Sequence, residues 1–307
     1  MVQNTYDLVI IGGGAAGVFC AINCAEAHPD KQIIILEKTG RLLSKVRISG
    51  GGRCNVTHAC FIPHELVKNY PRGGKKLRSL FNQFGCQDTV NWFQHRGVPL
   101  KTESDGRMFP KTNTSQTIVD CLEKLLQKNQ VQVAFHTPVT NLAQDTKDYY
   151  HVSAKNMQLR ASRVFIATGG SPSMKGFDWL NGLKHTIENP VPSLFTFNLH
   201  KAGLEHLAGV SVPKALVRIT GSKLEQTGPL LITHWGLSGP VILRLSAWGA
   251  REIAEKNYDF EIQVRWLADF QEEYLRQQFA DYARSHPARI VVKNQMFELP
   301  QRLWGFI

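Results

Sequence analysis

Residues 6–38 constrain the fold more than any other part of the sequence. The apolar run YDLVII at 6–11 ends in glycines, small and apolar residues continue at helical spacing from Ala15 to about Ala27, and KQIIILEK at 31–38 is a second apolar run. Short apolar runs of this kind are typical of strands buried in a parallel sheet. A strand, a helix and a second strand in about 30 residues form a βαβ unit, so the sequence predicts an α/β fold.

The uncharged run at residues 8–25 has a competing interpretation, because membrane spans and signal peptides also lack charge. However, Asp7 precedes the run, no Lys or Arg forms a basic region before it, and four glycines interrupt it. We therefore expect neither a signal peptide nor a membrane anchor.

Three glycines of this unit, Gly12, Gly14 and Gly17, have the spacing GxGxxG, and Glu37 follows Gly17 by 20 residues. In a dinucleotide-binding turn, the first glycine permits the turn, the second lets the backbone approach a pyrophosphate, and the third lets the helix pack on the strand. The helix N-terminus then presents free N–H groups to the phosphates. An acidic residue such as Glu37 accepts hydrogen bonds from a ribose, which favours FAD or NAD over NADP.

A second glycine triplet, in RISGGGRCNVTH at 47–58, favours FAD as the ligand. FAD is long, so it needs backbone approach from beyond the first βαβ unit. Glycines 50–52 permit that approach, while Ser49, Arg53 and Asn55 can supply hydrogen bonds. A double glycine at 169–170 follows another apolar run and offers a further approach.

The remaining pattern divides the chain near residue 190. Before it, we predict two amphipathic helices broken near Gly85, a helix over 114–129, strands over 131–136, 139–145 and 149–154, and a buried strand before the double glycine. After it, two prolines and short strands over 194–199, 215–220 and 229–233 indicate a β domain, and 265–288 has helical periodicity.

Charge and cysteine content limit the function classes. The net charge is +11 and the sequence pI is about 9.4, which favours anionic partners such as nucleotide phosphates or nucleic acid, and basic residues concentrate at 68–79. Six cysteines without a CxxC pair predict no disulfide framework and a reducing, cytoplasmic location. Cys20 and Cys24 are expected to pack as apolar residues, and no ligand set at zinc spacing predicts a metal site.

Several motifs in order resemble one protein family. They are DLVIIGGGAAG, EK at 37–38, KVRISGGGRCNVTH, GRMFP at 106–110, ATGG at 167–170 and THWGLSGPVIL at 233–243. Together they resemble the bacterial aminoacetone-oxidase-like or BaiN-like NAD(P)/FAD-dependent oxidoreductases over essentially the whole chain. The resemblance implies an FAD-binding Rossmann-like domain with a mixed, largely parallel sheet at 1–189. It also implies an insert at 190–307, with a β-barrel over about 190–262 and a helical part over about 263–307.

The resemblance also implies a set of cofactor-binding residues. Those expected at the pyrophosphate are Gly12, Gly14, Ala15 and Ala16, and those at the adenosine side are Glu37, Lys38 and the backbone of Val139. The residues expected along the phosphates and toward the flavin are Gly51, Gly52, Arg53, Cys54 and Asn55. Thr168 and Gly169 would flank the cofactor.

Members of the family usually continue for roughly another 90–100 residues, with Gly-Glu and Thr-Gly-Gly-Tyr-Asn segments that close over the flavin. This sequence contains neither segment, and the chain return that completes a doubly wound domain is missing from it. We therefore expect a truncated form, in which the 307 residues alone bind FAD weakly or not at all.

Cys54 and Cys60 raise an alternative, because disulfide-reducing flavoenzymes carry a cysteine pair in a similar GGxC segment. Here the two cysteines are one residue further apart than in those enzymes, which turns the second thiol by about 100° on a helix. The chain also has no second GxGxxG for NADPH. A small residue beside the cofactor is the favoured interpretation of Cys54.

The sequence thus predicts an FAD-dependent oxidoreductase that transfers a hydride between flavin and an unidentified small organic substrate, with NAD(P)H or oxygen completing the cycle. An RNA-associated flavoprotein, similar to tRNA-modifying ones, is an alternative because of the positive charge. A third alternative is a truncated, catalytically inactive remnant of such an enzyme. His234 is a candidate proton donor and Arg107 a candidate anion ligand, but no catalytic residue is assigned. The oligomeric state and the substrate stay open.

Overall fold

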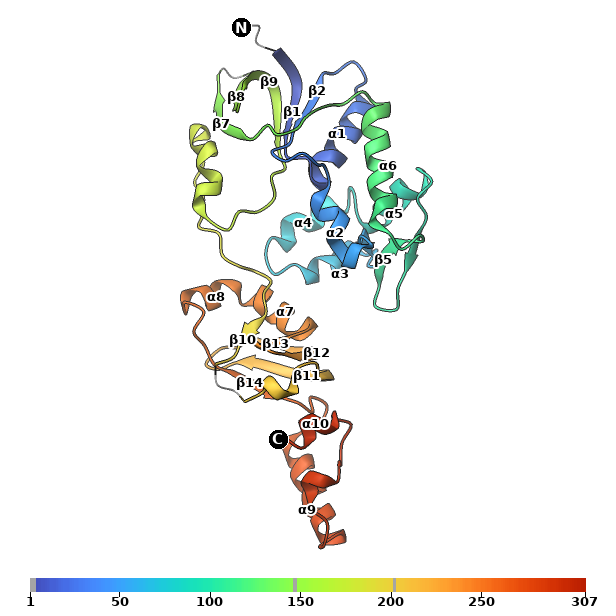
Figure 1. Cartoon of the computed structure of the whole chain (residues 1–307), viewed down its shortest axis with the longest axis vertical. Helices are drawn as coiled ribbons and strands as arrows, with labels where there is room; N and C mark the ends of the chain where they lie inside the picture. Colours follow the sequence, from blue (N-terminus) through green and yellow to red (C-terminus); the bar gives the residue numbers. More distant parts are fainter. Residues whose placement is uncertain (1–3, 146–147, 201–202) are drawn as a thin grey trace. The chain divides into compact units, whose positions relative to one another are not determined.

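The computed structural model describes residues 4–145, 148–200 and 203–307, and the chain forms two compact units, Met1–Pro190 and Val191–Ile307 (Figure 1). Each unit has its own hydrophobic core. The α/β fold class expected from the sequence is confirmed.

A six-stranded sheet in the order β6-β2-β1-β9-β8-β7 forms the centre of the first unit. Strands β1 (Asn4–Ile11), β2 (Ile33–Leu36), β6 (Gln132–Ala134) and β9 (Met157–Ile166) run parallel, whereas β7 (Val139–Gln144) and β8 (Tyr150–Ala154) pair antiparallel at one side. The mixed sheet brings the carboxyl ends of β1, β2 and β9 to one edge, which is where open α/β sheets bind ligands.

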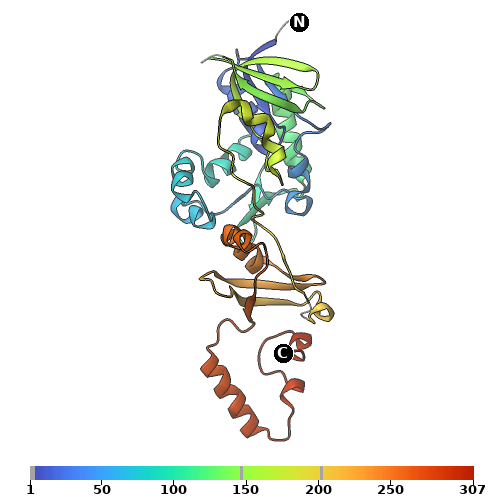
Figure 2. The same ribbon diagram turned by 90° about the vertical axis from the view of Figure 1, so that its left-hand side faces the viewer.

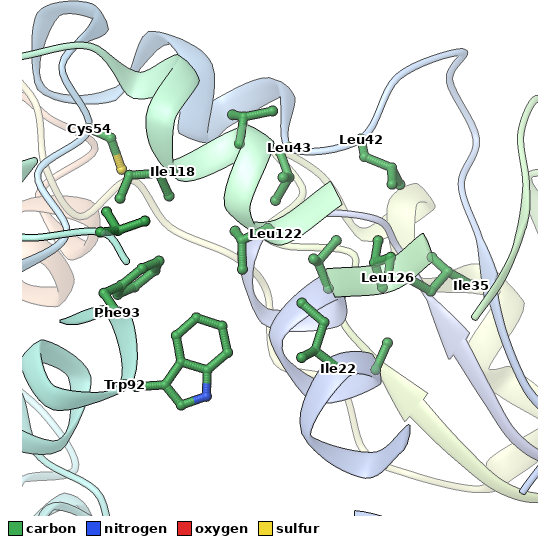
Figure 3. Packing of buried hydrophobic residues seen from close by; sticks show 14 of the residues in the cluster. Ile22, Ile35, Leu42, Leu43, Cys54, Trp92, Phe93, Ile118, Leu122 and Leu126 are labelled. Atoms are coloured by element: carbon green, nitrogen blue, oxygen red, sulfur yellow. The ribbon is translucent and has the colours of Figure 1, made fainter. Parts of the chain in front are cut away.

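Both faces of this sheet are covered. The helices α1 (Ala15–Ala27) and α6 (Ser115–Lys128) pack on one face, where Ile10 and Ile35 meet Ile22 and Leu122 (Figure 3). The opposite face contains Val9, Ile11 and Leu36 and packs against the 3₁₀ segment η2 (Met174–Leu183). Alternate residues of β1 therefore serve opposite cores, as the two-residue period of a strand requires.

The chain between β2 and α6 holds a small helical region and a three-stranded sheet, β3-β5-β4. The expected break near Gly85 is confirmed, since α4 ends at Phe81 and α5 begins at Cys86. The elements are α2 (Ser44–Gly52), β3 (Thr57–His58), α3 (Pro63–Leu66), η1 (Val67–Asn69), α4 (Gly74–Phe81), α5 (Cys86–Gln94), β4 (Leu100–Thr102) and β5 (Arg107–Pro110).

The second unit contains a five-stranded antiparallel sheet in the order β10-β13-β12-β11-β14. Its strands and short 3₁₀ segment are β10 (Phe197–Asn198), η3 (Glu205–Leu207), β11 (Ser211–Ile219), β12 (Glu225–Thr233), β13 (Gly236–Ser238) and β14 (Ile262–Arg265). Helices α7 (Pro240–Trp248) and α8 (Ala250–Glu255) lie on one side of the sheet (Figure 2).

The helical end of the second unit starts later than its sequence pattern suggests. The pattern predicts a helix from residue 265, whereas β14 ends at Arg265 and α9 covers Glu272–Ser285. The remaining segments are η4 (Val291–Lys293) and α10 (Gln301–Trp304). Leu299, Leu303 and Trp304 belong to the same buried cluster as the strands.

The packing predicts a large difference between two isoleucine truncations in the first unit. Ile22 is completely buried between α1 and the sheet, whereas Ile48 is 76% exposed. Ile22→Ala should lower the free energy of unfolding by about 2–5 kcal/mol because it leaves a cavity. Ile48→Ala should change it by less than about 0.5 kcal/mol. Urea unfolding followed by circular dichroism measures both, and equal losses would contradict the described core.

Candidate functional site

The first glycine motif joins β1 to α1 through a backbone contact that excludes side chains. A Cβ atom on Gly17 would lie 2.0 Å from the carbonyl oxygen of Gly12, and one on Gly12 would lie 2.5 Å from that of Ala167. Gly12 also has φ of +110°, which disfavours other residues. These two glycines therefore let α1 start directly against the ends of β1 and β9.

Gly14 differs from its two neighbours in the motif. It is the N-cap of α1, with φ of −81° and ψ of −172°, and a Cβ atom there would meet nothing within 4 Å. No side chain of the described residues caps the helix. Open space therefore lies against the backbone at the positive end of a 13-residue helix, which is the arrangement that binds phosphate groups.

Glu37 lies at the end of β2 and is only 9% exposed. Its Oε2 accepts a hydrogen bond from the N–H of Gly13 at 2.8 Å, and its Oε1 accepts two from the backbone and hydroxyl of Thr39, each at 2.8 Å. The carboxylate thus holds the glycine turn in place. Since two carboxylate oxygens offer about four acceptor positions, Oε2 keeps one for a ribose hydroxyl.

A cavity of about 380 Å³ opens beside Glu37 at the carboxyl ends of β1 and β2, and we call it the sheet-edge cavity. It contains six of the residues expected to bind the cofactor, namely Gly12, Glu37, Lys38, Val139, Thr168 and Gly169. Lys175 and Trp179 of η2 also line it. Sequence reasoning did not identify these two, because η2 carries no recognisable motif and reaches the cavity only through the fold.

A second cavity of about 510 Å³, the apolar cavity, is lined in part by residues at the start of α1, just after the glycine turn. Ala15, Ala16, Cys54 and Asn55 were expected at the cofactor and all line it. Most of its other lining is apolar and comes from α1, α5, α6 and the residues around them: Phe19, Val46, Val56, Phe84, Phe93, Ile118 and Leu122. The glycine turn therefore contributes Gly12 to one cavity and Ala15 and Ala16 to the other.

Lys45 also belongs to the neighbourhood of both cavities. It lines the apolar cavity, and its Nζ would lie 3.4 Å from a Cβ atom on Gly169, which lines the sheet-edge cavity. Lys45 is exposed, and none of the ion pairs among the described residues involves it. Nothing in its sequence context identified it, since single lysines before a glycine run are common on protein surfaces.

The second glycine triplet lies at the irregular end of α2, where Gly50, Gly51 and Gly52 all have positive φ. A Cβ atom on Gly50 would lie 2.8 Å from both the Asn55 nitrogen and the Phe109 ring, so this glycine serves packing. Cβ atoms on Gly51 and Gly52 would meet nothing within 4 Å. These two leave room for a ligand, although neither lines the two cavities described above.

Two polar residues of the expected site have partners within the protein. The Arg53 Nη1 donates to Glu103 Oε1 at 2.5 Å, and its guanidinium lies 4.0 Å from the Phe109 ring centre. The Asn55 amide is oriented to donate to the carbonyl oxygens of Thr57, at 2.9 Å, and Met108, at 3.2 Å. Both side chains therefore fasten the triplet to the β3-β5-β4 sheet.

Cys54 is 6% exposed and packs beside Ile118 in the core cluster (Figure 3). Burial raises the pKa of its thiol, although a hydrogen bond with Ser49 opposes that shift. Cys54 and Cys60 are both free thiols in the structure. A buried thiol with a raised pKa is a poor nucleophile, so the geometry does not favour a disulfide exchange role.

The two remaining candidates have different surroundings. Arg107 donates from its Nε to Asp105 at 2.7 Å and lies 3.5 Å from Glu103. Both ion pairs hold the Arg107 side chain against its own loop. His234 is exposed in the turn between β12 and β13 of the second unit.

The helices of the described residues are all too short or too polar to span a membrane. No group of three or more His, Cys, Asp or Glu side chains in the described part of the chain could hold a metal ion. Cys20 and Cys24, 3.9 Å apart, pack against the main core.

The contrast between the glycines predicts two different phenotypes. Gly17→Ala forces a Cβ atom against backbone, so it should destabilise the first unit by several kcal/mol or prevent folding. Gly14→Ala should keep the unfolding free energy within about 1 kcal/mol, because its φ suits alanine and the space is open. FAD titration by flavin fluorescence should nevertheless show affinity at least about tenfold lower for Gly14→Ala. Unchanged affinity would contradict a ligand at this backbone.

Cys54→Ser should retain flavin-dependent turnover within about threefold, because its buried thiol is protonated near neutral pH. The raised pKa also predicts slow alkylation of Cys54 by iodoacetamide in the folded protein at pH 8, and fast alkylation in urea. Mass spectrometry of the modified peptide measures this. Loss of turnover in Cys54→Ser with flavin still bound would instead support a disulfide-exchange role for Cys54.

The amino-acid sequence matches two family models. The model described as "HI0933-like protein Rossmann domain" matches residues 6–238, and the one described as "HI0933-like protein barrel and H2TH domain" matches residues 191–307.

Three curated relatives illustrate the range of this similarity. The chain is 26% identical over 278 residues to a 3-dehydro-bile acid delta(4,6)-reductase of Clostridium scindens, covering 88% of this chain and 66% of that protein. It is 29% identical over 312 residues to a ribosomal RNA dihydrouridine synthase of Escherichia coli, covering 98% of this chain and 73% of that protein. A fumarate reductase flavoprotein subunit of Serratia is 26% identical over 204 residues, which cover 58% of this chain and 34% of that protein. The chain thus spans about two thirds of the first relative.

The family models and the motifs agree, and the chain belongs to the HI0933-like family of aminoacetone-oxidase-like and BaiN-like FAD-dependent oxidoreductases.

Proposed function

We propose that this protein uses FAD to reduce a carbon–carbon double bond conjugated to a carbonyl group, with NAD(P)H as the electron donor. The observation that carries the proposal is the glycine turn at Gly12–Gly17, which contributes to two cavities of different character. The sheet-edge cavity includes the charged residues Glu37, Lys38 and Lys175 in its lining, whereas the lining of the other cavity is largely apolar. FAD has a polar ribose near one end and an aromatic ring system at the other, so its two ends match the linings of the two cavities.

The residues present fit FAD. The open space at Gly14 would let the pyrophosphate approach the N-terminus of α1, Glu37 Oε2 would accept from the adenosine ribose, and the Val139 backbone would border the adenine. Lys38, Thr168 and Gly169 would border the same end, and Lys45 would add positive charge near the phosphates. When bound, FAD supplies reversible two-electron hydride transfer.

The apolar cavity would place the reacting end among apolar side chains. Its lining of Phe19, Phe93 and Ile118 lowers the local dielectric, which strengthens the hydrogen bonds that orient a polar substrate carbonyl. Gly51, Gly52, Cys54 and Asn55 lie in the segment that would border this end. No side chain is assigned as the proton donor.

The names of three relatives share one chemical change. A delta(4,6)-reductase, a dihydrouridine synthase and a fumarate reductase each act on a carbon–carbon double bond that is conjugated to a carbonyl or carboxylate group. In the proposed reaction the β carbon gains a hydride, the α carbon gains a proton, and NAD(P)H is oxidised to NAD(P)⁺. Atoms and electrons therefore balance without oxygen.

Two substrate classes fit this reaction. A small unsaturated ketone or acid suits the apolar cavity. A uracil base in RNA contains the same conjugated bond, and the net charge of +11 together with similarity to a ribosomal RNA enzyme over 98% of the chain favours it as the second candidate. The six free cysteines fit a reducing compartment, so we propose action in the cytoplasm.

The reaction is testable with FAD added in excess under anaerobic conditions. The chain with NADPH or NADH should convert 2-cyclohexen-1-one, or uridine in an RNA oligonucleotide, to a product heavier by two hydrogen atoms. Gly14→Ala should reduce the rate at subsaturating FAD by at least about tenfold. Oxidation of NAD(P)H that requires oxygen and leaves both double bonds intact would contradict the proposal.

A further inference from the structure

Helix α4 carries three exposed cations that the proposed cofactor site does not use. They are Lys75, Lys76 and Arg78, which we call the α4 basic surface. Residues 61–85 contain five basic residues and a single acidic one, Glu65. The charge in this segment is therefore strongly positive, and its five basic residues lie within 68–78, the densest basic stretch of the sequence.

Glu65 does not neutralise the α4 basic surface. Both of its carboxylate oxygens accept from Lys68 at 2.7 Å, and His64 lies 3.2 Å away. None of the ion pairs formed within residues 4–145, 148–200 and 203–307 involves Lys75, Lys76 or Arg78. Exposed cations without an internal ion pair give up no protein contact when they bind an anion.

The packing of α4 points these cations away from the protein. Leu77 and Phe81, four residues apart, are half-buried, and the Phe81 ring lies 5.5 Å from that of Tyr70. At about 100° per residue, Lys75 lies on the side of the helix away from Leu77 and Phe81, and Lys76 and Arg78 flank it. Tyr70, which packs against Phe81, is itself 42% exposed.

The α4 basic surface is also connected to the apolar cavity. Phe84 follows the helix by three residues, lines that cavity and packs edge-on against Phe19 with ring centres 5.5 Å apart. Phe84 therefore links the segment that follows α4 to the lining of the apolar cavity.

We propose that the α4 basic surface binds the phosphate backbone of RNA and brings a nucleobase to the apolar cavity. This deepens the second substrate class of the proposed function and rests on it for the base, whereas the backbone contact stands on the exposed cations alone. An anionic membrane fits less well, because α4 has only eight residues and two of its apolar side chains face inward. The similarity to a ribosomal RNA enzyme further favours RNA.

The test uses the full chain and a fluorescently labelled, uridine-rich RNA hairpin, with binding followed by anisotropy between 50 and 200 mM KCl. Reversal of three charges, Lys75→Glu, Lys76→Glu and Arg78→Glu, should weaken binding at least about tenfold. The neutral set Lys75→Gln, Lys76→Gln and Arg78→Gln should flatten the dependence of log K on log salt. The expected change in slope is about 0.7 to 0.9 for each phosphate that the helix no longer neutralises.

A matched control reverses three other exposed lysines of the same unit, Lys124→Glu, Lys128→Glu and Lys155→Glu, with the same change in net charge. The proposal requires this control to weaken binding by less than about threefold, because these lysines would change the overall charge equally but would not contact the RNA backbone. Equal weakening in both charge-reversed variants, or none in the α4 variant, would overturn it. Binding of the α4 basic surface to phosphatidylserine vesicles but not to RNA would overturn it as well.

Failure of this proposal is separable from failure of the proposed function. The α4 variants should bind added FAD and reduce 2-cyclohexen-1-one as the unaltered chain does, since no α4 cation lines either cavity. Weakened RNA binding with intact reduction of the small ketone supports the α4 basic surface. Intact RNA binding in those variants overturns it, whatever the activity.

Discussion

The close approach of α1 to the end of β1 is the contact on which the rest of the first unit depends. The site of a Cβ atom on Gly17 lies 2.0 Å from the Gly12 carbonyl oxygen, so only glycine permits the helix to begin there. Once α1 is placed, its apolar side covers the sheet, and its N-terminus faces the edge where β1, β2 and β9 end. Glu37 then fixes the turn through the N–H of Gly13. The contact that sets the fold therefore also places the backbone at which we propose phosphate binding.

Each of the two glycine segments contains glycines that packing requires and glycines that border open space. Gly12, Gly17 and Gly50 are required because other atoms occupy the place of a side chain, whereas Gly14, Gly51 and Gly52 leave open space. The first group builds the scaffold, and the second leaves backbone open where we propose that the cofactor binds. Arg53, Cys54 and Asn55 are held by Glu103, the core cluster and the β3-β5-β4 sheet, so they stiffen the second segment.

Local sequence patterns predicted the parts whose stability is local. The run from Ala15 to Ala27 became α1 with those bounds, and 114–129 became α6 within one residue at each end. Helix α2 was not predicted, because SKVRISGGG has no apolar period and glycines weaken helices. Distant contacts support it instead, since Ser115 donates to the Arg47 carbonyl at 2.7 Å and Arg47 pairs with Glu123 at 2.8 Å. Lys45, Lys175 and Trp179 were not predicted for the same reason.

The central claim is that one dinucleotide spans both cavities across the glycine turn. Hydrogen–deuterium exchange on the full chain, with saturating FAD or ADP, tests it most directly. We predict that FAD slows exchange at 12–17, at 37–38, at 168–169 and at 51–55 together, and that ADP slows only the segments of the turn and the sheet-edge cavity. Protection by FAD at a single cavity, or none at the glycine turn, would contradict the account.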